Sequence, residues 1–291
     1  MTREPSSFVD SGGLRLAVYE QGPADAPVIL AVHGFPDNHH VWDEVATLLA
    51  TRYRVITYDV RGAGRSAAPP DRAGYRLDAL AADLTAVVAA VSPQQPVHLL
   101  AHDWGSIQAW HAVTDPRHVA SFRSYTSLSG PCLDHVALWT RSQLAQRRLS
   151  GVLGQLLHSW YVLAFQLPRL PELAWGATAL RARYHAERRD AVNGIELYRA
   201  NMLRVQRKPQ QRRTTVPVQQ LVLARDAFVR PAVIASADPY CDRLWRRELD
   251  SDHWAPRSRP GEVASLTEEF LVHIDRGEPS AKLDAALVMA R

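Results

Sequence analysis

Residues 97–106 read VHLLAHDWGS, and this stretch decides the fold. The continuous apolar run Val97–His102 predicts a strand buried on both faces, and a helix is expected over Trp104–Val113. A strand that runs straight into a helix through a sharp turn needs small side chains, because the two backbones approach closely there. Such side chains stand at Ala101, Gly105 and Ser106. The spacing predicts a nucleophile elbow, a turn that presents its central residue for chemistry.

The central residue of this turn is Asp103, at the position where esterases carry a serine. An aspartate side chain is ordinarily ionised at neutral pH, so it can attack carbon without a base and leave an ester on the protein. The start of the following helix further favours the anion. The alternative interpretation is that Asp103 only caps that helix.

Strand-like and helix-like runs alternate through the first 130 residues. Strands are predicted at Leu14–Tyr19, Pro27–His33, Tyr53–Tyr58 and Ser121–Leu128, and helices at Val41–Ala50 and Leu77–Val91. This alternation predicts an α/β fold, with a mostly parallel sheet flanked by helices. Ligands of such sheets bind at the carboxyl ends of the strands, where we expect the functional residues.

After this region the strand signals disappear. Leu- and Arg-rich helical patterns broken by proline predict an inserted helical lid over residues 131–213. Core-like patterns then resume with a strand and a last helix, at Val216–Ala224 and Pro260–Asp275. The predicted core therefore comprises residues 1–130 and 214–291. Its tail from Arg276 onward carries no motif and is expected to pack loosely.

The segment AVHGFPDN, residues 31–38, follows one of the apolar strands. A His-Gly-X-Pro turn at this point favours a loop whose backbone N–H groups stabilise a developing negative charge. The N–H groups of Phe35 and Trp104 are predicted to form this oxyanion hole. A plain Gly-Phe-Pro turn is the alternative.

A Gly-rich loop, YDVRGAGRS at residues 58–66, closes the next strand. It lacks the Lys-Ser/Thr ending of a phosphate-binding loop. We interpret it as structural, with Asp59 and Arg61 pairing locally.

Two further residues complete a triad with the elbow aspartate. LVLARDAF places Asp226 just after the resumed strand, and DSDHWAPRSRP places His253 in a loop before the last helix. The order nucleophile, acid, base is the order found in folds with this elbow. His253 is predicted to take a proton from water, and Asp226 to orient the imidazole. Alternatively, Asp226 caps a helix and His253 is one of twelve unexceptional histidines.

The composition is that of an ordinary globular protein, with 291 residues and 22% charged side chains. The two cysteines, Cys132 and Cys241, are too few for a disulfide framework and lack zinc-binding spacing. No apolar run is long enough to span a membrane, and no secretory signal is visible, so we expect a cytoplasmic protein without an integral membrane segment.

The net charge is +4, and basic residues concentrate in the lid. Between residues 137 and 213 there are fourteen basic side chains and four acidic ones. Such a surface suits acidic ligands, anionic lipid or nucleic acid, but a solvated helical surface is the simpler interpretation. No nucleic-acid motif accompanies the charge, so no nucleic-acid partner is expected. A homodimer is left open as the oligomeric state.

With these motifs the chain resembles the epoxide hydrolases of the α/β-hydrolase superfamily, which are relatives of the haloalkane dehalogenases. The resemblance lies between residues 33 and 257 and is carried by HGFPDNHHVW, YDVRGAGRS, VHLLAHDWGS, SWYVLAFQLP, LYRANM and DHWAPRS. The chain is most similar to the hydrolase half of an actinobacterial protein fused to a short-chain dehydrogenase, without the dehydrogenase half. Two departures are Asp252, where relatives usually carry glycine, and Ala101, where glycine is common.

The resemblance implies that Tyr161 and Tyr198 in the lid hydrogen-bond the epoxide oxygen. A phenol can donate to this oxygen as negative charge develops on it. The alternative is that both are amphipathic core tyrosines. The expected substrate-binding residues are His33, Pro36, Trp160 and Trp254.

The resulting hypothesis is an epoxide hydrolase that opens an apolar epoxide to a vicinal diol through an ester on Asp103, without metal or cofactor. A haloalkane or haloacid dehalogenase would use the same ester, with indole N–H groups from Trp104 and Trp160 binding the halide. A third alternative is a hydrolase-fold protein that binds a ligand or partner without turnover.

Overall fold

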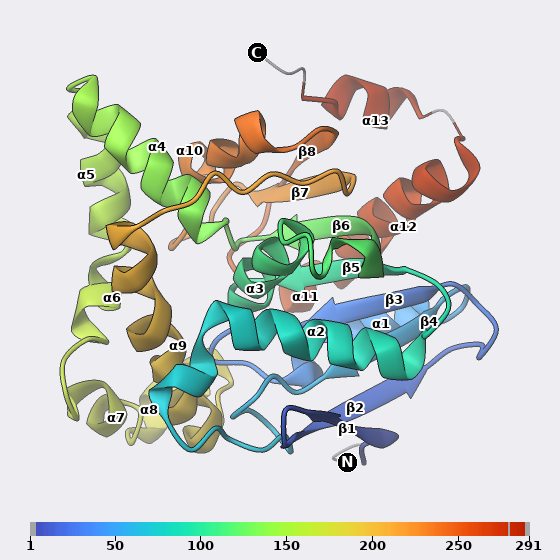
Figure 1. Ribbon diagram of the computed structural model, residues 1–291, viewed down its shortest axis with the longest axis horizontal. Helices are drawn as coiled ribbons and strands as arrows, with labels where there is room; N and C mark the ends of the chain where they lie inside the picture. Colours follow the sequence, from blue (N-terminus) through green and yellow to red (C-terminus); the bar gives the residue numbers. More distant parts are fainter. Residues whose placement is uncertain (1–3, 279, 289–291) are drawn as a thin grey trace.

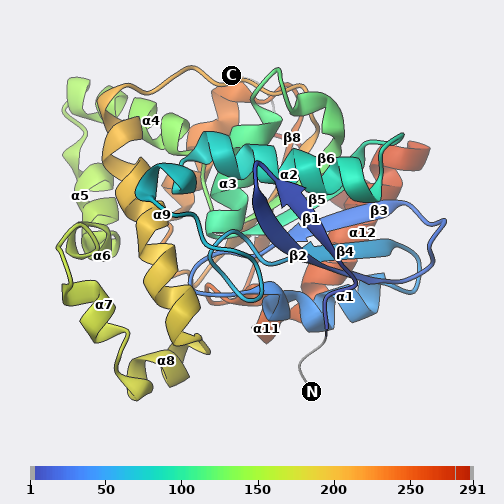
Figure 2. The ribbon, with the colours of Figure 1, turned by 60° about the horizontal axis from the view of Figure 1, so that its bottom comes forward.

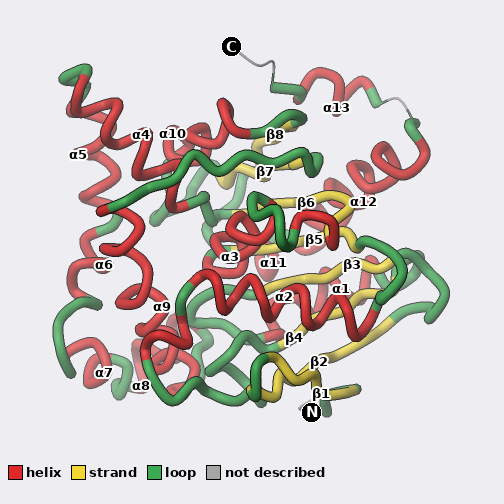
Figure 3. Tube along the Cα trace, in the orientation of Figure 1, coloured by secondary structure: helices red, strands yellow, loops and turns green. Residues whose placement is uncertain are grey.

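The computed structural model describes residues 4–278 and 280–288. These residues form one eight-stranded sheet with the order β1-β2-β4-β3-β5-β6-β7-β8 (Figures 1 and 3). The strands are β1 (Ser7–Ser11), β2 (Leu14–Gln21), β3 (Val28–Val32), β4 (Arg54–Tyr58), β5 (Val97–His102), β6 (Phe122–Leu128), β7 (Val218–Leu223) and β8 (Leu244–Leu249). Strands β3 to β8 pair in parallel, while β1 and β2 are antiparallel additions at one edge. The predicted mostly parallel sheet is confirmed.

Helices cover both faces of this sheet. On one face lie α2 (Leu77–Val91) and α3 (Trp104–Val113); on the other lie α1 (Asp43–Leu49), α11 (Ala255–Ser258) and α12 (Pro260–Arg276) (Figure 1). Helix α2 buries Leu80, Leu84 and Val87 at helical spacing against the sheet. Strand β5 is buried along its whole length, because helices pack on both of its faces.

Six further helices come between β6 and β7 in the chain and form the predicted lid. The lid helices are α4 (Leu133–Ala145), α5 (Leu149–His158), α6 (Trp160–Ala164), α7 (Leu170–Ala174), α8 (Thr178–Tyr184) and α9 (Arg188–Arg207). Figure 2 shows them stacked together to one side of the sheet. The ion pair between Asp134 and Arg212, 2.8 Å from Oδ2 to Nε, ties the segment that enters the lid to the segment that leaves it. No helix in the described chain is both long and apolar enough to cross a membrane.

Short helices complete the described structure. They are α10 (Pro231–Ile234), α13 (Ala281–Ala286) and the 3-10 helices η1 (His39–Trp42), η2 (Arg72–Tyr75), η3 (Val119–Ser121) and η4 (Ala235–Tyr240). Helix α13 corrects the expectation of a loosely packed tail, because its Leu283 is fully buried. Strands β1 and β8 also lie outside the sequence prediction, which otherwise placed the strands and the long helices of the core.

Candidate active site

The turn between β5 and α3 presents Asp103 in a strained conformation. Its φ of 53° and ψ of −123° lie where non-glycine residues are rare. Side chains around it must be small: a Cβ on Gly105 would lie 2.2 Å from the Val32 carbonyl oxygen, and one on Gly130 would lie 2.1 Å from that of Asp103. The Asp103 side chain makes no capping hydrogen bond to α3. The backbone is therefore a nucleophile elbow, and the helix-cap alternative has no support in the geometry.

The loop after β3 holds the carboxylate from the other side. The Phe35 N–H donates a charge-assisted hydrogen bond of 2.7 Å to Oδ1 of Asp103. A Cβ on Gly34 would lie 2.3 Å from this oxygen and 2.6 Å from the Trp104 nitrogen, so only glycine fits between the two. The Phe35 N–H therefore holds one oxygen of Asp103, and the missing side chain of Gly34 leaves space next to the Trp104 nitrogen, which is compatible with the predicted oxyanion hole.

His253 lies between two carboxylates. Its Nε2 is 3.6 Å from Oδ2 of Asp103, and its Nδ1 is 3.1 Å from Oδ2 of Asp226. Burial lowers the pKa of this imidazole, but the negative charges of Asp226 and Asp103 outweigh it and raise the pKa to about 10. The structure therefore brings the three residues of the predicted triad together, although they are 123 and 27 residues apart in the chain.

Asp226 is held by several donors at once. Ser129 Oγ donates to its Oδ2 at 2.5 Å, and the N–H groups of Phe228 and Val229 donate to its Oδ1. Burial raises the pKa of this carboxyl, but His253 and these hydrogen bonds lower it to about 2. A carboxylate so bound stays ionised and keeps the imidazole in one orientation. Ser129 was not predicted, because nothing in its sequence neighbourhood distinguishes it.

His102 is a second residue that sequence reasoning missed. It ends β5, is fully buried, and its Nε2–H donates to the backbone oxygen of His253 at 2.7 Å. Burial and the neighbouring His253 lower the pKa of His102 to about 4, so this ring is neutral. Its Nδ1 has no hydrogen-bond partner among the described residues. His102 fixes the backbone of the catalytic loop, and its position next to Asp103 was the available signal.

A cavity of about 780 Å³ lies between this triad and the lid. Its walls are mostly aromatic and aliphatic, as ligand sites usually are. Eight of the predicted site residues line it: Phe35, Pro36, Asp103, Trp160, Tyr161, Tyr198, His253 and Trp254. Asp226 and Trp104 do not line it, and Asp226 lies behind His253 as a triad acid should.

The two lid tyrosines come from different helices and converge. Tyr161 lies on α6 and Tyr198 on α9, with ring centroids 5.9 Å apart. Tyr198 also packs edge-on against Phe35 at 5.3 Å and Trp104 at 4.9 Å. Burial and the nearby Asp103 raise the pKa of both phenols, so both keep their proton and can donate it in a hydrogen bond.

Trp254 is positioned by a residue that was not predicted. Its indole N–H donates to Oδ2 of Asp37 at 3.0 Å, and Arg257 donates to the other oxygen of this buried carboxylate. Asp37 belongs to the HGFPDN turn, so the loop that carries the oxyanion N–H also fixes one wall of the cavity.

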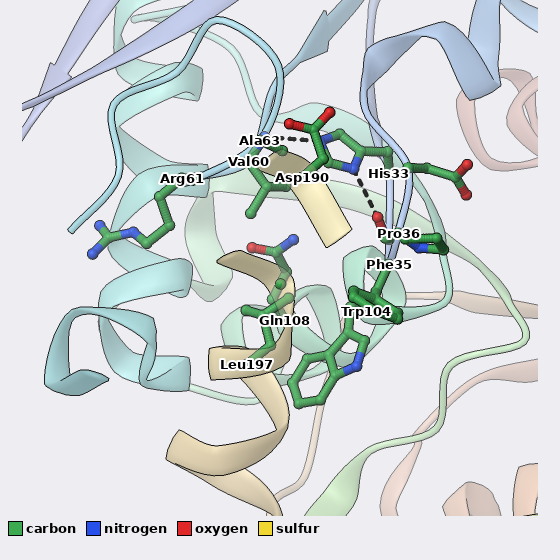
Figure 4. A pocket seen from close by; sticks show the side chains of 14 residues that line it. His33, Phe35, Pro36, Val60, Arg61, Ala63, Trp104, Gln108, Asp190 and Leu197 are labelled. Atoms are coloured by element: carbon green, nitrogen blue, oxygen red, sulfur yellow. Dashed lines mark hydrogen bonds between the residues drawn. The ribbon is translucent and has the colours of Figure 1, made fainter. Parts of the chain in front are cut away.

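His33 corrects one substrate-binding expectation, because its side chain does not line the large cavity. Its Nδ1–H donates to the Gly34 oxygen at 2.9 Å, and its Nε2 accepts from the Val60 N–H at 2.8 Å (Figure 4). Burial lowers the pKa of this ring, which suits the neutral form that these bonds require. His33 borders a separate cavity of only about 20 Å³ and joins two loops of the core.

The Gly-rich loop after β4 is structural, but the predicted pair within it is wrong. Asp59 accepts from His39 Nδ1 at 2.7 Å and from Tyr19 at 2.9 Å, while Arg61 pairs with Asp83 on α2 at 2.5 Å. Each side chain therefore ties the loop to a different element instead of to its neighbour in sequence.

The described residues contain one group with the spacing of metal ligands: Asp78, His111 and Asp115. Arg117 already pairs with Asp115 at 2.7 Å, and Arg212 approaches His111 Nε2 at 3.4 Å. These cations balance the charge of the group, and its residues line a second cavity of about 780 Å³ that none of the triad residues lines. We assign no role to it.

Comparison with known proteins identifies the class. A family profile described as alpha/beta hydrolase fold matches residues 27–256, and the chain belongs to this family. Among curated proteins, the probable oxidoreductase EphD of Mycobacterium tuberculosis is 35% identical over 99% of this chain. The match covers 53% of that protein, so the chain spans about half the length of this relative. Epoxide hydrolase 3 of Xenopus tropicalis is 26% identical, over 90% of this chain and 77% of its own length.

Solved structures share the fold. The Bacillus megaterium epoxide hydrolase in complex with an inhibitor aligns with a TM-score of 0.74 and 20% identity, covering 91% of this chain and 99% of that chain. An epoxide hydrolase from metagenomes of hot environments aligns with a TM-score of 0.76 and 23% identity, covering 93% and 99%. At these identities the likeness concerns the fold.

Proposed function

We propose that this chain is an epoxide hydrolase that opens an apolar epoxide to a vicinal diol through an ester on Asp103. The observation that carries the proposal is the placement of two protonated phenols, Tyr161 and Tyr198, across an apolar cavity from the elbow carboxylate. A carboxylate nucleophile alone is also compatible with dehalogenation. The names of several relatives, epoxide hydrolase 3 among them, support the same activity.

In the first step, one oxygen of Asp103 attacks an epoxide carbon. Oδ1 is held by the Phe35 N–H, so Oδ2 is the oxygen free to attack. The C–O bond of the ring breaks, and the epoxide oxygen becomes an alkoxide. The phenols of Tyr161 and Tyr198 donate hydrogen bonds to it as charge develops, and one phenol passes on a proton. This step leaves an alkyl ester on Asp103.

In the second step, water attacks the ester carbon. His253 takes the proton of this water through Nε2, the nitrogen that faces Asp103. The charge of Asp103 is one cause of the raised pKa of His253, and the ester removes this charge. Esterification therefore lowers the pKa of the imidazole at the moment when it must act as a base. The N–H groups of Phe35 and Trp104 stabilise the tetrahedral oxyanion, and Asp226 stabilises the imidazolium. The intermediate then collapses as the bond between the Asp103 carboxyl carbon and the diol oxygen breaks, and the imidazolium of His253 protonates this departing oxygen. The proton left on the Asp103 carboxyl returns to the phenolate, which restores the carboxylate nucleophile.

Dehalogenation is the less favoured alternative, because halide binding needs N–H donors directed into the cavity. The Trp104 indole does not line the large cavity and lies instead beside the small one (Figure 4). Trp160 does line the large cavity, but its side chain is 67% exposed. A halide there would keep much of its hydration.

The function is tested by incubating the protein with styrene oxide and, separately, with 1-bromobutane. Diol formation from the epoxide is expected, and release of bromide without diol formation would overturn the proposal.

In His253→Gln the ester should form but hydrolyse slowly, so intact mass spectrometry should detect protein plus substrate. Asp103→Asn is the matched control and should neither turn over nor gain mass; retention of the biological role in this variant would instead favour a non-catalytic protein.

Residues 131–213 are proposed as the lid and residues 1–130 and 214–291 as the core. The expected substrate is a small-molecule apolar epoxide, and the expected location is the cytoplasm, with no nucleic-acid partner. A homodimer stays an open prediction, to be measured by light scattering of the purified protein.

A further inference from the structure

The outer helices of the lid expose an unusual amount of apolar surface. Within the fully described stretch 149–173, nine large apolar side chains are each between 47% and 76% exposed. They are Leu149, Leu153, Leu156, Leu157, Trp160, Leu163, Leu167, Leu170 and Leu173, which together we call the outer lid surface. Figures 1 and 2 both place α5, α6 and α7 along one edge of the molecule, outside α9. A concentration of exposed apolar side chains in one segment is typical of a site of interaction.

The chain segment that carries the outer lid surface is strongly basic. Between residues 135 and 186 there are six arginines, and the only acidic residue is Glu172. Glu172 is already paired with Arg199 at 2.6 Å. Arg147 and Arg148, directly before α5, and Arg169, between α6 and α7, are exposed, and their side chains form no ion pair within the described chain. Two of these arginines therefore precede the apolar stretch and one lies within it, between Leu167 and Leu170.

The outer lid surface is continuous with the mouth of the active-site cavity. Leu157, Trp160, Leu167 and Leu170 belong to both, since each is exposed and each also lines the cavity. An apolar molecule that enters the cavity from this surface would reach Asp103 without crossing bulk water. The outer lid surface is thus placed both to contact a partner and to admit a substrate to the cavity.

We propose that the outer lid surface docks on an anionic lipid layer and that the epoxide substrate enters the cavity from that layer. This inference rests on the proposed function. Leucine and tryptophan on one side and arginines around them are the composition of surfaces that lie in a membrane interface. The substrate class is then an epoxide carried on a lipid-soluble chain. A second copy of the chain is disfavoured as the occupant, because a two-fold contact would bring the free arginines of both copies together without acidic partners.

The first experiment is co-sedimentation of the full chain with vesicles of phosphatidylglycerol or of phosphatidylcholine. Binding to the anionic vesicles and weaker binding to the neutral ones are expected. The triple variant Leu153→Ser, Leu163→Ser and Leu173→Ser changes exposed residues that do not line the cavity, and it should lower the partition coefficient at least tenfold. Leu48→Ser on α1, where an exposed leucine of the core is changed, is the control and should bind as the unchanged protein does.

Charge and activity give two further measurements. Arg147→Gln with Arg148→Gln should weaken binding to anionic vesicles about fivefold per arginine and leave binding to neutral vesicles unchanged. The triple leucine variant should hydrolyse soluble styrene oxide at the normal rate, but should turn over an epoxide dissolved in anionic vesicles at least tenfold more slowly. If no epoxide is hydrolysed by any variant while vesicle binding follows this pattern, the proposed function fails and the docking surface stands.

Two results would overturn the docking proposal. The first is sedimentation of the unchanged protein with neither kind of vesicle. The second is a stable dimer in sedimentation velocity that the triple leucine variant dissociates, which would assign the outer lid surface to a second copy of the chain.

Discussion

At the residue scale, the site depends on close approaches that only glycine permits. Gly34 lies where a Cβ would meet both Oδ1 of Asp103 and the nitrogen of Trp104. The carboxylate can therefore sit in the oxyanion hole only because this side chain is missing. The same loop carries the Phe35 N–H, so a small displacement of Gly34 separates donor from acceptor.

Gly34→Ala should lower kcat at least 100-fold, the effect expected for losing an oxyanion donor, while the protein stays folded. Steady-state kinetics and circular dichroism measure the two properties. Gly261→Ala is the control, since a Cβ there meets nothing within 4 Å and the position is helical. Normal kcat in Gly34→Ala would show that the loop does not constrain the nucleophile.

The charges around His253 make its contribution to stability depend on pH. Its pKa in the folded protein, about 10, lies above the ordinary value of 6.5. The stabilisation is therefore complete below about pH 6.5 and is lost as the pH rises through 10. From the size of the shift it amounts to about 5 kcal/mol at most.

The prediction is that the difference in unfolding free energy between the unchanged protein and His253→Gln decreases steadily between pH 6 and pH 10. Urea denaturation of both proteins at several pH values measures it. A difference that is constant over this range would mean that Asp103 and Asp226 do not hold a charged imidazole in the free protein.

At the element scale, helix α9 of the lid contacts the loops that surround Asp103. Its Asp190 accepts from Asn38 at 3.0 Å and from the Gly64 N–H at 2.9 Å. One turn further, a Cβ on Gly194 would lie 2.4 Å from the Phe35 ring. Glycine inside a helix ordinarily costs about 1 kcal/mol relative to alanine, so its presence here reflects close packing on the oxyanion loop.

Gly194→Ala should consequently lower kcat about tenfold, although helix propensity alone would make the variant more stable. The kinetics should be compared with those of Gly151→Ala on α5, where a Cβ would meet Trp139 at an ordinary 3.5 Å. Equal activity in both variants would refute a role for α9 in positioning Phe35.

Helix α13 gives a separate test of the core. Leu283 is fully buried, whereas Leu287, just after the helix, is 42% exposed. Leu283→Ala should lower the free energy of unfolding by about 3 kcal/mol, and Leu287→Ala by less than about 0.5 kcal/mol. Urea denaturation distinguishes them, and a negligible effect of Leu283→Ala would mean that the tail does pack loosely.

The elements that sequence predicted differ physically from those that it missed. Strand β5 and helix α3 are apolar and lie in the centre, so their patterns follow the structure directly. Strand β8 lies at the sheet edge and contains Arg246 and Arg247, which pair with Asp238 and Glu269. Charges with distant partners interrupt the apolar pattern of such a strand, and only the folded chain shows what balances them.

At the scale of the whole molecule, the chain order of nucleophile, acid and base already predicted the meeting of the triad residues. Asp103 and Asp226 follow predicted strands, whereas β8, the strand before His253, was not predicted. The supporting residues could not be predicted in this way. Ser129, Asp37 and His102 act through hydrogen bonds to partners far away in the chain. The substrate-binding role predicted for His33 was wrong for the same reason, because its Nε2 accepts from the distant Val60 N–H.

The proposed mechanism requires that water attacks an ester of Asp103 and not the epoxide itself. A single turnover with excess protein in ¹⁸O-labelled water tests it directly. We predict that the first diol formed carries no ¹⁸O and that the label appears in the peptide containing Asp103. Label in the first diol, with an unlabelled Asp103 peptide, would contradict the account.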